Sequence, residues 1–306
     1  MKIVYAGMPE FAIKPLEAIL EAGYEVVGVV TQPDKPQGRK GILTPSPVKR
    51  LALSHGVAVL QPAKVRDEVG ALKALGGDLL ITCAYGQILT QEVLDAFPLG
   101  VYNIHASLLP KYRGASPIQW AVLNGEEETG ITVMKTDIGL DTGDVLLQRS
   151  LKVGSDNAGE LAVRLSSLGA ACILEALSLI EGGNAVLRKQ EGESTLVKKL
   201  SRESARVDWN RSAEEIVRLI RGMNPSPVAF TLAEGQTLNL FAAEAAGYEG
   251  EEESGTVLTD LPKQGLLVKC KGGAVRLLEV QLAGGKRMKA SDFLNGRKIR
   301  KGQILA

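Results

Sequence analysis

The segment MKIVYAGMPEFAIKPLEAILEAGYEVVGVV, residues 1–30, decides the fold of this chain. Its residues Ile3–Ala6 form an apolar run that stops at Gly7, as expected for a buried strand followed by a turn. Apolar residues then recur at helical spacing over residues 11–20, and the valine-rich run 24–30 predicts a second strand. A strand, a helix and a second strand in this order are typical of a parallel β-α-β unit.

The pattern continues outward from this segment. A helix is predicted over residues 47–54, and short apolar strands over 57–60, 79–84 and 101–105. This alternation predicts an α/β fold with a doubly wound, mostly parallel, Rossmann-like sheet, in which ligands bind beyond the carboxyl ends of the strands. The first turn, AGMPEF, lacks the G-x-G-x-x-G pattern, so the sequence gives no support for a dinucleotide site.

The second half of the chain has a different pattern. A long amphipathic helix is predicted over 161–180, and Ser212 with Glu215 forms a capping box that opens another helix. Five short strands follow between residues 229 and 281, which is typical of a small β-barrel of the OB-like kind. We therefore predict a first domain over residues 1–187, a polar linker over 188–208 and a barrel domain over 209–306.

Charge is unevenly distributed along the chain. The whole sequence has 36 Lys+Arg and 35 Asp+Glu, a net charge of +1, whereas residues 256–306 contain 11 Lys+Arg and 3 Asp+Glu, a net of +8. The polar connection TQPDKPQGRKGILTPSPV, residues 31–48, adds Lys35, Arg39 and Lys40. Such basic groups suit a phosphate-rich polyanion. A solvated lysine-rich surface and a flexible polar loop are the alternatives.

Composition excludes several classes of protein. The three cysteines, Cys83, Cys172 and Cys270, are far apart, so we expect neither a disulfide framework nor a cysteine zinc site. Two histidines are too few for a histidine-rich metal centre, and we expect no metal. No apolar run reaches about 18 residues and the N-terminus does not resemble a signal peptide, so we expect a cytoplasmic protein without a membrane span.

The candidate catalytic residues are a histidine, an asparagine and a group of carboxylates. His55 ends a predicted helix, where it is expected to cap carbonyl groups. His105 ends a strand and is the candidate acid or base, with Asn103 two residues earlier on the same face as a neutral donor for an oxyanion. A hydrogen-bonded histidine at a strand end is the alternative. The loop KTDIGLDTGDVL contains three carboxylates, Asp137, Asp141 and Asp144. One of them could be the partner of His105. By themselves, the three could also form a turn cluster or a weak Mg²⁺ site.

Over its whole length the chain resembles the 10-formyltetrahydrofolate-dependent formyltransferase family. The resemblance is most specific in NIHASLLPKYRGASPIQWAVLNGEEETGITVMKTDIGLDTGDVL, residues 103–146. Supporting matches are AGMPEFA, QPDKPQGRKGILTPSPVK and VDWNRSAEEIVRLIRGMNPSP. The chain departs from the family at Ser226, where many relatives have an aromatic residue.

The resemblance implies a site and a reaction. The family's catalytic residues match Asn103, His105 and Asp141, which would assist direct attack of an amine on the formyl group of 10-formyltetrahydrofolate. Folate contacts are implied at Gln87, Ile88, Leu89, Ser107, Leu108, Leu109, Pro110, Thr136, Asp137 and Asp141. Contacts to the acceptor, initiator methionyl-tRNA, are implied at Lys35, Arg39, Lys40, Lys286, Arg287, Lys289, Arg297 and Lys298.

Other functions stay open. The same chemistry could act on the amine of an amino-sugar nucleotide or of glycinamide ribotide, although neither small substrate needs so large a basic surface. A non-catalytic tRNA-binding module on a transferase fold is the alternative from another class, which the intact set of Asn103, His105 and Asp141 disfavours. We expect direct attack by the substrate amine, without a covalent enzyme intermediate. We also expect the protein to be a monomer.

Overall fold

The computed structural model describes residues 1–37, 41–296 and 299–306, which form two compact units. The first unit comprises residues 1–117, 128–152 and 162–197, and the second comprises 118–127, 153–161 and 198–306. Residues 188–208, the predicted linker, are thus divided, because 188–197 pack with the first unit and 198–208 with the second.

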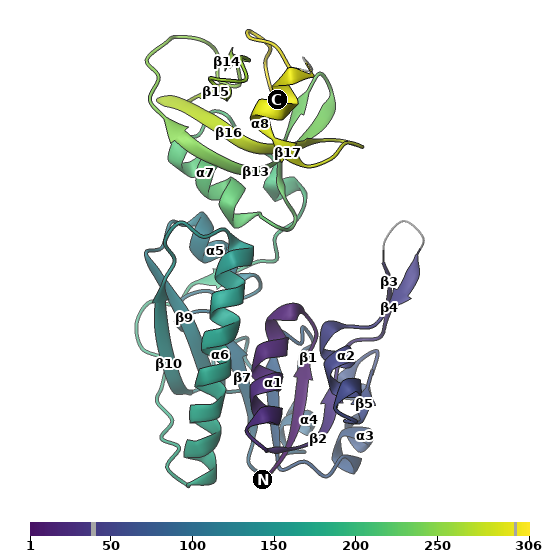
Figure 1. Ribbon diagram of the computed structural model, residues 1–306. Coiled ribbons are helices and arrows are strands. Elements are labelled where there is room, and N and C mark those ends of the chain that lie inside the picture. The colour runs from purple at the N-terminus through teal and green to yellow at the C-terminus, as the bar shows by residue number, and fades with distance from the viewer. Residues whose placement is uncertain (38–40, 297–298) are drawn as a thin grey trace. The chain divides into compact units, whose positions relative to one another are not determined.

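Within the described residues, the first unit is built on a seven-stranded sheet of order β10-β9-β7-β6-β1-β2-β5 (Figure 1). Five strands pair in parallel, namely β1 (Lys2–Gly7), β2 (Glu25–Val30), β5 (Val59–Leu60), β6 (Leu79–Cys83) and β7 (Val101–His105). Two antiparallel strands extend one edge, β9 (Glu128–Lys135) and β10 (Val145–Lys152). The predicted α/β class with a mostly parallel sheet is confirmed.

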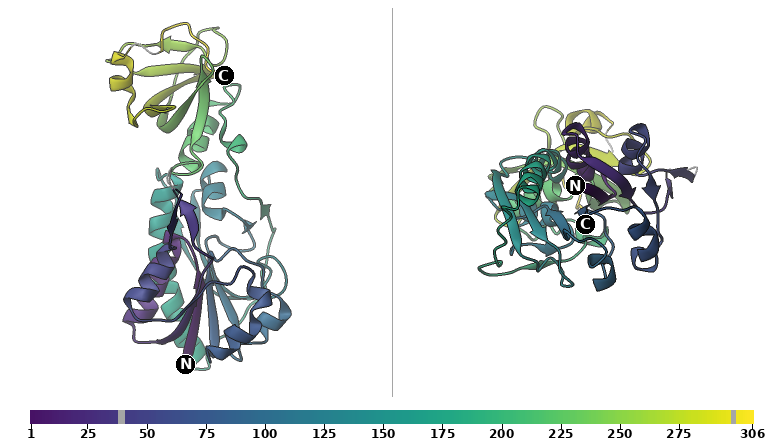
Figure 2. Two further views of the ribbon diagram at one scale, coloured as in Figure 1. Left: turned by 90° about the vertical axis from the view of Figure 1, so that its right-hand side faces the viewer. Right: turned by 90° about the horizontal axis from the view of Figure 1, so that it is seen from below.

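Helices cover both faces of this sheet (Figure 2, left). On one face lie α1 (Ile13–Glu21) and α6 (Ala158–Glu181), where Gly169 of α6 approaches Ile104 and Ile131. On the other face lie α3 (Val69–Ala74) and α4 (Gln91–Leu94), which share a buried cluster with β-strand residues that include Val101. Because side chains alternate along a strand, Asn103 and His105 lie on the Val101 face.

The remaining elements of the first unit lie around the sheet. The helix α2 (Pro47–Ser54) has the predicted bounds, and His55 caps it with Nδ1 3.1 Å from the Leu51 carbonyl oxygen, as expected. The strands β3 (Lys35–Gln37) and β4 (Ile42–Thr44) form a hairpin that stands out from the unit (Figure 1). The short strands β8 (Arg113–Gly114) and β11 (Leu196–Val197) pair in parallel.

The helix α6 is long and apolar enough to cross a membrane by length and composition alone. Core helices of soluble proteins pass the same test, so a single such helix is weak evidence for a membrane span. Six apolar residues of α6 are almost completely buried within the protein: Leu161, Leu165, Cys172, Ile173, Ala176 and Leu177. The protein core that α6 helps to form therefore accounts for part of its apolar composition.

The second unit is a small antiparallel barrel. Its sheet has the order β12-β13-β16-β15-β14 and comprises β12 (Ala229–Ala233), β13 (Gln236–Ala246), β14 (Val257–Thr259), β15 (Leu266–Cys270) and β16 (Gly273–Leu282), with β17 (Met288–Lys289) on β16. The last residues close the sheet, because Ile304 bridges to Thr256 beside β14 and Leu305 bridges to Ala233 in β12. All five predicted strands are present, and α5 (Pro117–Leu123), α7 (Ala213–Gly222) and α8 (Ala290–Asn295) complete the helices.

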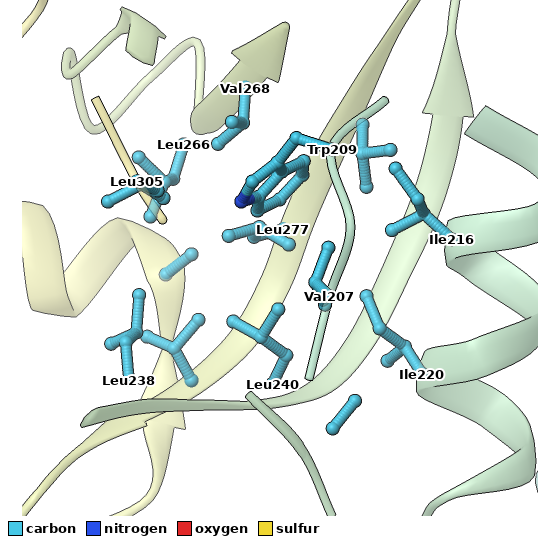
Figure 3. Packing of buried hydrophobic residues seen from close by; sticks show 14 of the residues in the cluster. Val207, Trp209, Ile216, Ile220, Leu238, Leu240, Leu266, Val268, Leu277 and Leu305 are labelled. Carbon is cyan, nitrogen blue, oxygen red and sulfur yellow. The ribbon is translucent and has the colours of Figure 1, made fainter. Parts of the chain in front are cut away.

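The core of the second unit extends beyond the barrel strands. Figure 3 shows Trp209 between strand residues such as Leu277 and the helical residues Ile216 and Ile220. The indole N–H of Trp209 donates to the hydroxyl of Thr231 over 3.0 Å. The segment before α7 thus helps to form the core of this unit.

Candidate active site

The strand β7 supplies two of the three predicted catalytic side chains. Asn103 is half-buried and accepts a hydrogen bond from the hydroxyl of Thr82, its partner on β6, over 3.0 Å from Oγ1 to Oδ1. With Oδ1 occupied in this way, the amide NH₂ of Asn103 is the group left to donate to a substrate oxygen. Thr82 was not identified from the sequence, although a threonine in the otherwise apolar run LLITC was the signal.

The imidazole of His105 is buried, with 6% of the side chain exposed, and its two nitrogens have different partners. Nε2 lies 3.0 Å from the carbonyl oxygen of Tyr112. Because a carbonyl only accepts, Nε2 carries a hydrogen, and proton exchange is left to Nδ1. Nδ1 lies 3.7 Å from Oδ2 of Asp141, which is too long for a hydrogen bond but close enough for Coulomb attraction when the imidazole is protonated.

Asp141 lies in the loop between β9 and β10. Its side chain is 14% exposed, and Oδ2 accepts a hydrogen bond from the Gly114 amide over 2.8 Å. Its backbone has φ +53°, a left-handed conformation that costs a residue with a side chain about 1–3 kcal/mol. The surrounding contacts must therefore hold Asp141 in place. His105 and Asp141 thus come together from two separate segments, and Asn103 lies two residues from His105 on the same face of β7.

The two other carboxylates of this loop have structural partners. Asp137 Oδ1 accepts from the Gly139 amide and from the Thr142 hydroxyl, so it stabilises the loop internally. Asp144 pairs with Lys189, with 2.9 Å between Oδ1 and Nζ. Within residues 1–37, 41–296 and 299–306, no group of three or more His, Cys, Asp or Glu side chains is arranged to hold a metal ion.

The turn that follows β7 is held by a buried polar network. Thr132 is fully buried and lies opposite His105 on β9; its hydroxyl donates to the Ser107 carbonyl oxygen and accepts from the Leu109 amide. The Gln148 amide donates to that hydroxyl and to the Leu109 carbonyl oxygen. Ser107 itself donates to the Lys111 carbonyl oxygen over 2.6 Å. Neither Thr132 nor Gln148 was recognised from the sequence.

The implied folate residues have diverse environments. Ile88 is 84% exposed, and the exposed apolar residues Ile138 and Leu140 lie in the loop of Asp141, whereas Leu89 packs partly against the core. The Gln87 side chain is bound to backbone groups of residues 62–65. Thr136 has a buried hydroxyl without a hydrogen-bond partner in the described part of the chain. Leu109 and Pro110 are buried, and Leu108 is half-buried.

The implied tRNA residues are described only in part. Lys35 is exposed on β3, and Lys286 and Lys289 are exposed on the barrel unit. Arg287 is ion-paired with Glu279 and stacks 4.2 Å from the ring of Phe241, so its charge is partly compensated. Four further candidates lie outside the described residues: Arg39, Lys40, Arg297 and Lys298.

Comparisons with known proteins agree with this architecture. The family model described as "Formyl transferase" matches residues 1–177, and "Formyl transferase, C-terminal domain" matches residues 199–298. The chain is 43% identical to a methionyl-tRNA formyltransferase from Ruminiclostridium cellulolyticum over 310 residues, which cover 100% of this chain and 99% of the relative.

Two solved structures share the fold. A methionyl-tRNA formyltransferase from Clostridium thermocellum superposes with a TM-score of 0.56 at 19% identity and covers 82% of this chain and 95% of its own. HypX from Aquifex aeolicus, solved in complex with tetrahydrofolic acid, has a TM-score of 0.69 at 20% identity and covers 96% of this chain and 47% of its own. With both family models matched in order and a relative this similar over its full length, the chain belongs to the formyl transferase family.

Proposed function

We propose that this chain transfers the formyl group of 10-formyltetrahydrofolate to the α-amino group of methionyl-initiator tRNA. The observation that carries the proposal is the arrangement of His105, whose Nδ1 faces the Asp141 carboxylate at 3.7 Å while Nε2 is held by a carbonyl oxygen. The name of the full-length relative at 43% identity supports methionyl-tRNA as the acceptor.

The residues of the site suit attack by an amine on a formyl carbon. When bound, 10-formyltetrahydrofolate supplies that carbon, and tetrahydrofolate leaves as the new amide bond forms. The Asn103 amide and protonated Nδ1 of His105 donate hydrogen bonds to the formyl oxygen as it gains negative charge. Each such donor is typically worth about 3–4 kcal/mol of transition-state stabilisation.

Asp141 has a separate role in this scheme. Its carboxylate stabilises the positive charge of the imidazolium through Coulomb attraction, and the gap of 3.7 Å leaves His105 free to direct its proton toward substrate. The proton that the amine loses passes, directly or through water, to N10 of the departing tetrahydrofolate, so His105 ends the step in the protonation state in which it began. No enzyme side chain forms a covalent bond to the formyl group.

Basic side chains on both units support a nucleic-acid acceptor. We assign contacts with tRNA phosphates to the basic residues of the segment 31–48 and of the second unit, namely Lys35, Arg39, Lys40, Lys286, Arg287, Lys289, Arg297 and Lys298. If they make such contacts, KM for tRNA rises steeply with salt, because each neutralised phosphate releases counterions. We further propose that the enzyme is a cytoplasmic monomer and requires no metal.

The test is formyl transfer with a set of competing amines. Purified protein is incubated with 10-formyltetrahydrofolate and methionyl-initiator tRNA, and formylmethionine is measured after release from the tRNA. Uncharged tRNA, elongator methionyl-tRNA, an amino-sugar nucleotide and glycinamide ribotide are run in parallel. We expect efficient formylation of methionyl-initiator tRNA alone. Turnover of one of the small amines in its place would contradict the proposed acceptor, and folate binding without any turnover would identify a non-catalytic module.

A further inference from the structure

Residues 188–197 pair with two segments of the first unit that flank the proposed catalytic residues. Arg188 and Val145 exchange two backbone hydrogen bonds, of 2.7 and 2.9 Å. Further along, β11 pairs with β8, and the contact is so close that a Cβ added to Gly114 would lie 2.5 Å from the Val197 carbonyl oxygen. We refer to residues 188–197 as the strap.

Gln190 of the strap connects the two elements that hold Asp141. Its Nε2 donates to the carbonyl oxygens of Asp141 and Gly143, each over 2.8 Å. Its Oε1 accepts from Nη2 and Nε of Arg113, over 2.7 and 3.1 Å. Arg113 is followed by Gly114, whose amide binds the carboxylate of Asp141. One amide group therefore fixes both the left-handed backbone of Asp141 and the strand that orients its carboxylate.

Thr195 of the strap acts on the other side of the site. Its hydroxyl accepts from the Tyr112 amide over 2.7 Å, and its carbonyl oxygen accepts from the Arg113 amide over 2.9 Å. Tyr112 has φ +61°, and its carbonyl oxygen is the partner of His105 Nε2. Thr195 thus supports the backbone group that sets the orientation of the imidazole.

We infer that two residues of the strap position the proposed catalytic side chains, Gln190 for Asp141 and Thr195 for His105. The inference rests on the proposed function, because it assumes that Asp141 and His105 assist formyl transfer. In this inference, Gln190 and Thr195 act on the rate of transfer through Asp141 and His105. Displacement of a catalytic group by about 1 Å can lower a rate by up to about 100-fold.

The primary variant is Gln190→Met, which keeps the length of the side chain and removes all four hydrogen bonds. We expect kcat to fall about 10- to 100-fold, with KM for tRNA and the Kd of tetrahydrofolate nearly unchanged. The matched control is Glu191→Gln, an exposed neighbour on the same segment, which should retain full activity. Thr195→Val should lower kcat about 3- to 10-fold, and Thr195→Ser, which keeps the hydroxyl, should restore it.

A double-mutant cycle with Asp141→Asn separates positioning from general destabilisation. If Gln190 acts through Asp141, Gln190→Met should lower kcat by less than about 3-fold in the Asp141→Asn background. An equal loss in both backgrounds would overturn the inference, as would near-normal kcat in both Gln190→Met and Thr195→Val. If Gln190→Met does not fold, the inference is tested at the exposed residue Thr195 instead. The two variants compared are then Thr195→Val, which lacks the hydroxyl, and Thr195→Ser, which keeps it. Full activity of Asp141→Asn itself would instead refute the proposed function.

Discussion

From the hydrogen bond that Thr82 donates to Asn103, we predict that a variant without the Thr82 hydroxyl has a lower kcat. Thr82→Val keeps the shape of a side chain that is 7% exposed but removes the hydroxyl that donates to Asn103 Oδ1 over 3.0 Å. In the productive orientation, that oxygen would then lack its donor, which costs about 1–3 kcal/mol. The amide relieves this cost by turning away from the orientation in which its NH₂ faces the substrate.

The size of the effect follows from that cost. At about 1.4 kcal/mol for each tenfold change in rate, a loss of 1–3 kcal/mol lowers kcat about 5- to 150-fold. Complete removal of the donor by Asn103→Ala sets the upper limit, about 10²- to 10³-fold. Thr82→Ser keeps the hydroxyl and should remain close to wild type, and Tm should change little in both Thr82 variants.

The assay is steady-state formylation of methionyl-tRNA at saturating folate, with KM measured for both substrates. We expect the loss to lie in kcat, with KM nearly constant. In an Asn103→Ala background, Thr82→Val should have almost no further effect, because the group it orients is absent. A Thr82→Val enzyme with wild-type kcat, or a full additional loss in the Asn103→Ala background, would refute the assignment.

Three further predictions concern other parts of the molecule. Asp141→Asn should lose most activity, whereas Asp144→Asn should lose less than about 3-fold, because Asp144 only forms a partly exposed pair with Lys189; the reverse order in kcat would show that the wrong carboxylate was chosen. Lys49 Nζ lies 2.7 Å from Asp34 and 2.6 Å from Gln61, at the base of the β3–β4 hairpin. Lys49→Met should therefore raise KM for tRNA several-fold and leave the affinity for folate unchanged. The control is Lys73→Met, which removes an exposed lysine elsewhere in the first unit. The hydrogen bond from Lys49 lowers the pKa of Asp34, so this contact should persist above the ordinary pKa of aspartate and be lost only as the pH falls through the lowered value. Burial raises the pKa of Cys83 to about 12 and that of Cys172 to about 11, and it also raises the pKa of Cys270. A thiol reagent at pH 8 should therefore label the native protein slowly, and it should label all three cysteines after denaturation. Rapid labelling of the native protein would contradict the buried positions.

Apolar runs and the spacing of apolar residues predicted many of the strands and helices. The apolar runs of β1 and β2 and the strands of the barrel were located to within a few residues, and α2 has its predicted bounds. The strand β9 was not predicted: Gly130–Met134 are all buried and show no alternation. Helices α5 and α8 are short and were also not predicted.

The proposed catalytic residues could be assigned to one site because two of them share a strand and the third lies in a motif that resembles the family's. The residues that position them could not. Gln190 contacts Asp141 across 49 residues and Arg113 across 77, and nothing in a polar, charged segment indicates such partners. The sequence therefore suggested a linker at a place where hydrogen bonding creates a strap.

The proposed function requires that His105 of this chain assist formyl transfer to methionyl-tRNA. The most direct test is a single-turnover measurement, with enzyme in excess over methionyl-initiator tRNA and saturating 10-formyltetrahydrofolate, for wild type and His105→Ala. Because the variant lacks both a donor to the formyl oxygen and a proton-exchanging group, we predict a loss of at least about 10²-fold in the rate of formylmethionyl-tRNA formation, with tRNA binding unchanged. A folded His105→Ala enzyme that forms the product at close to the wild-type rate would contradict the claim.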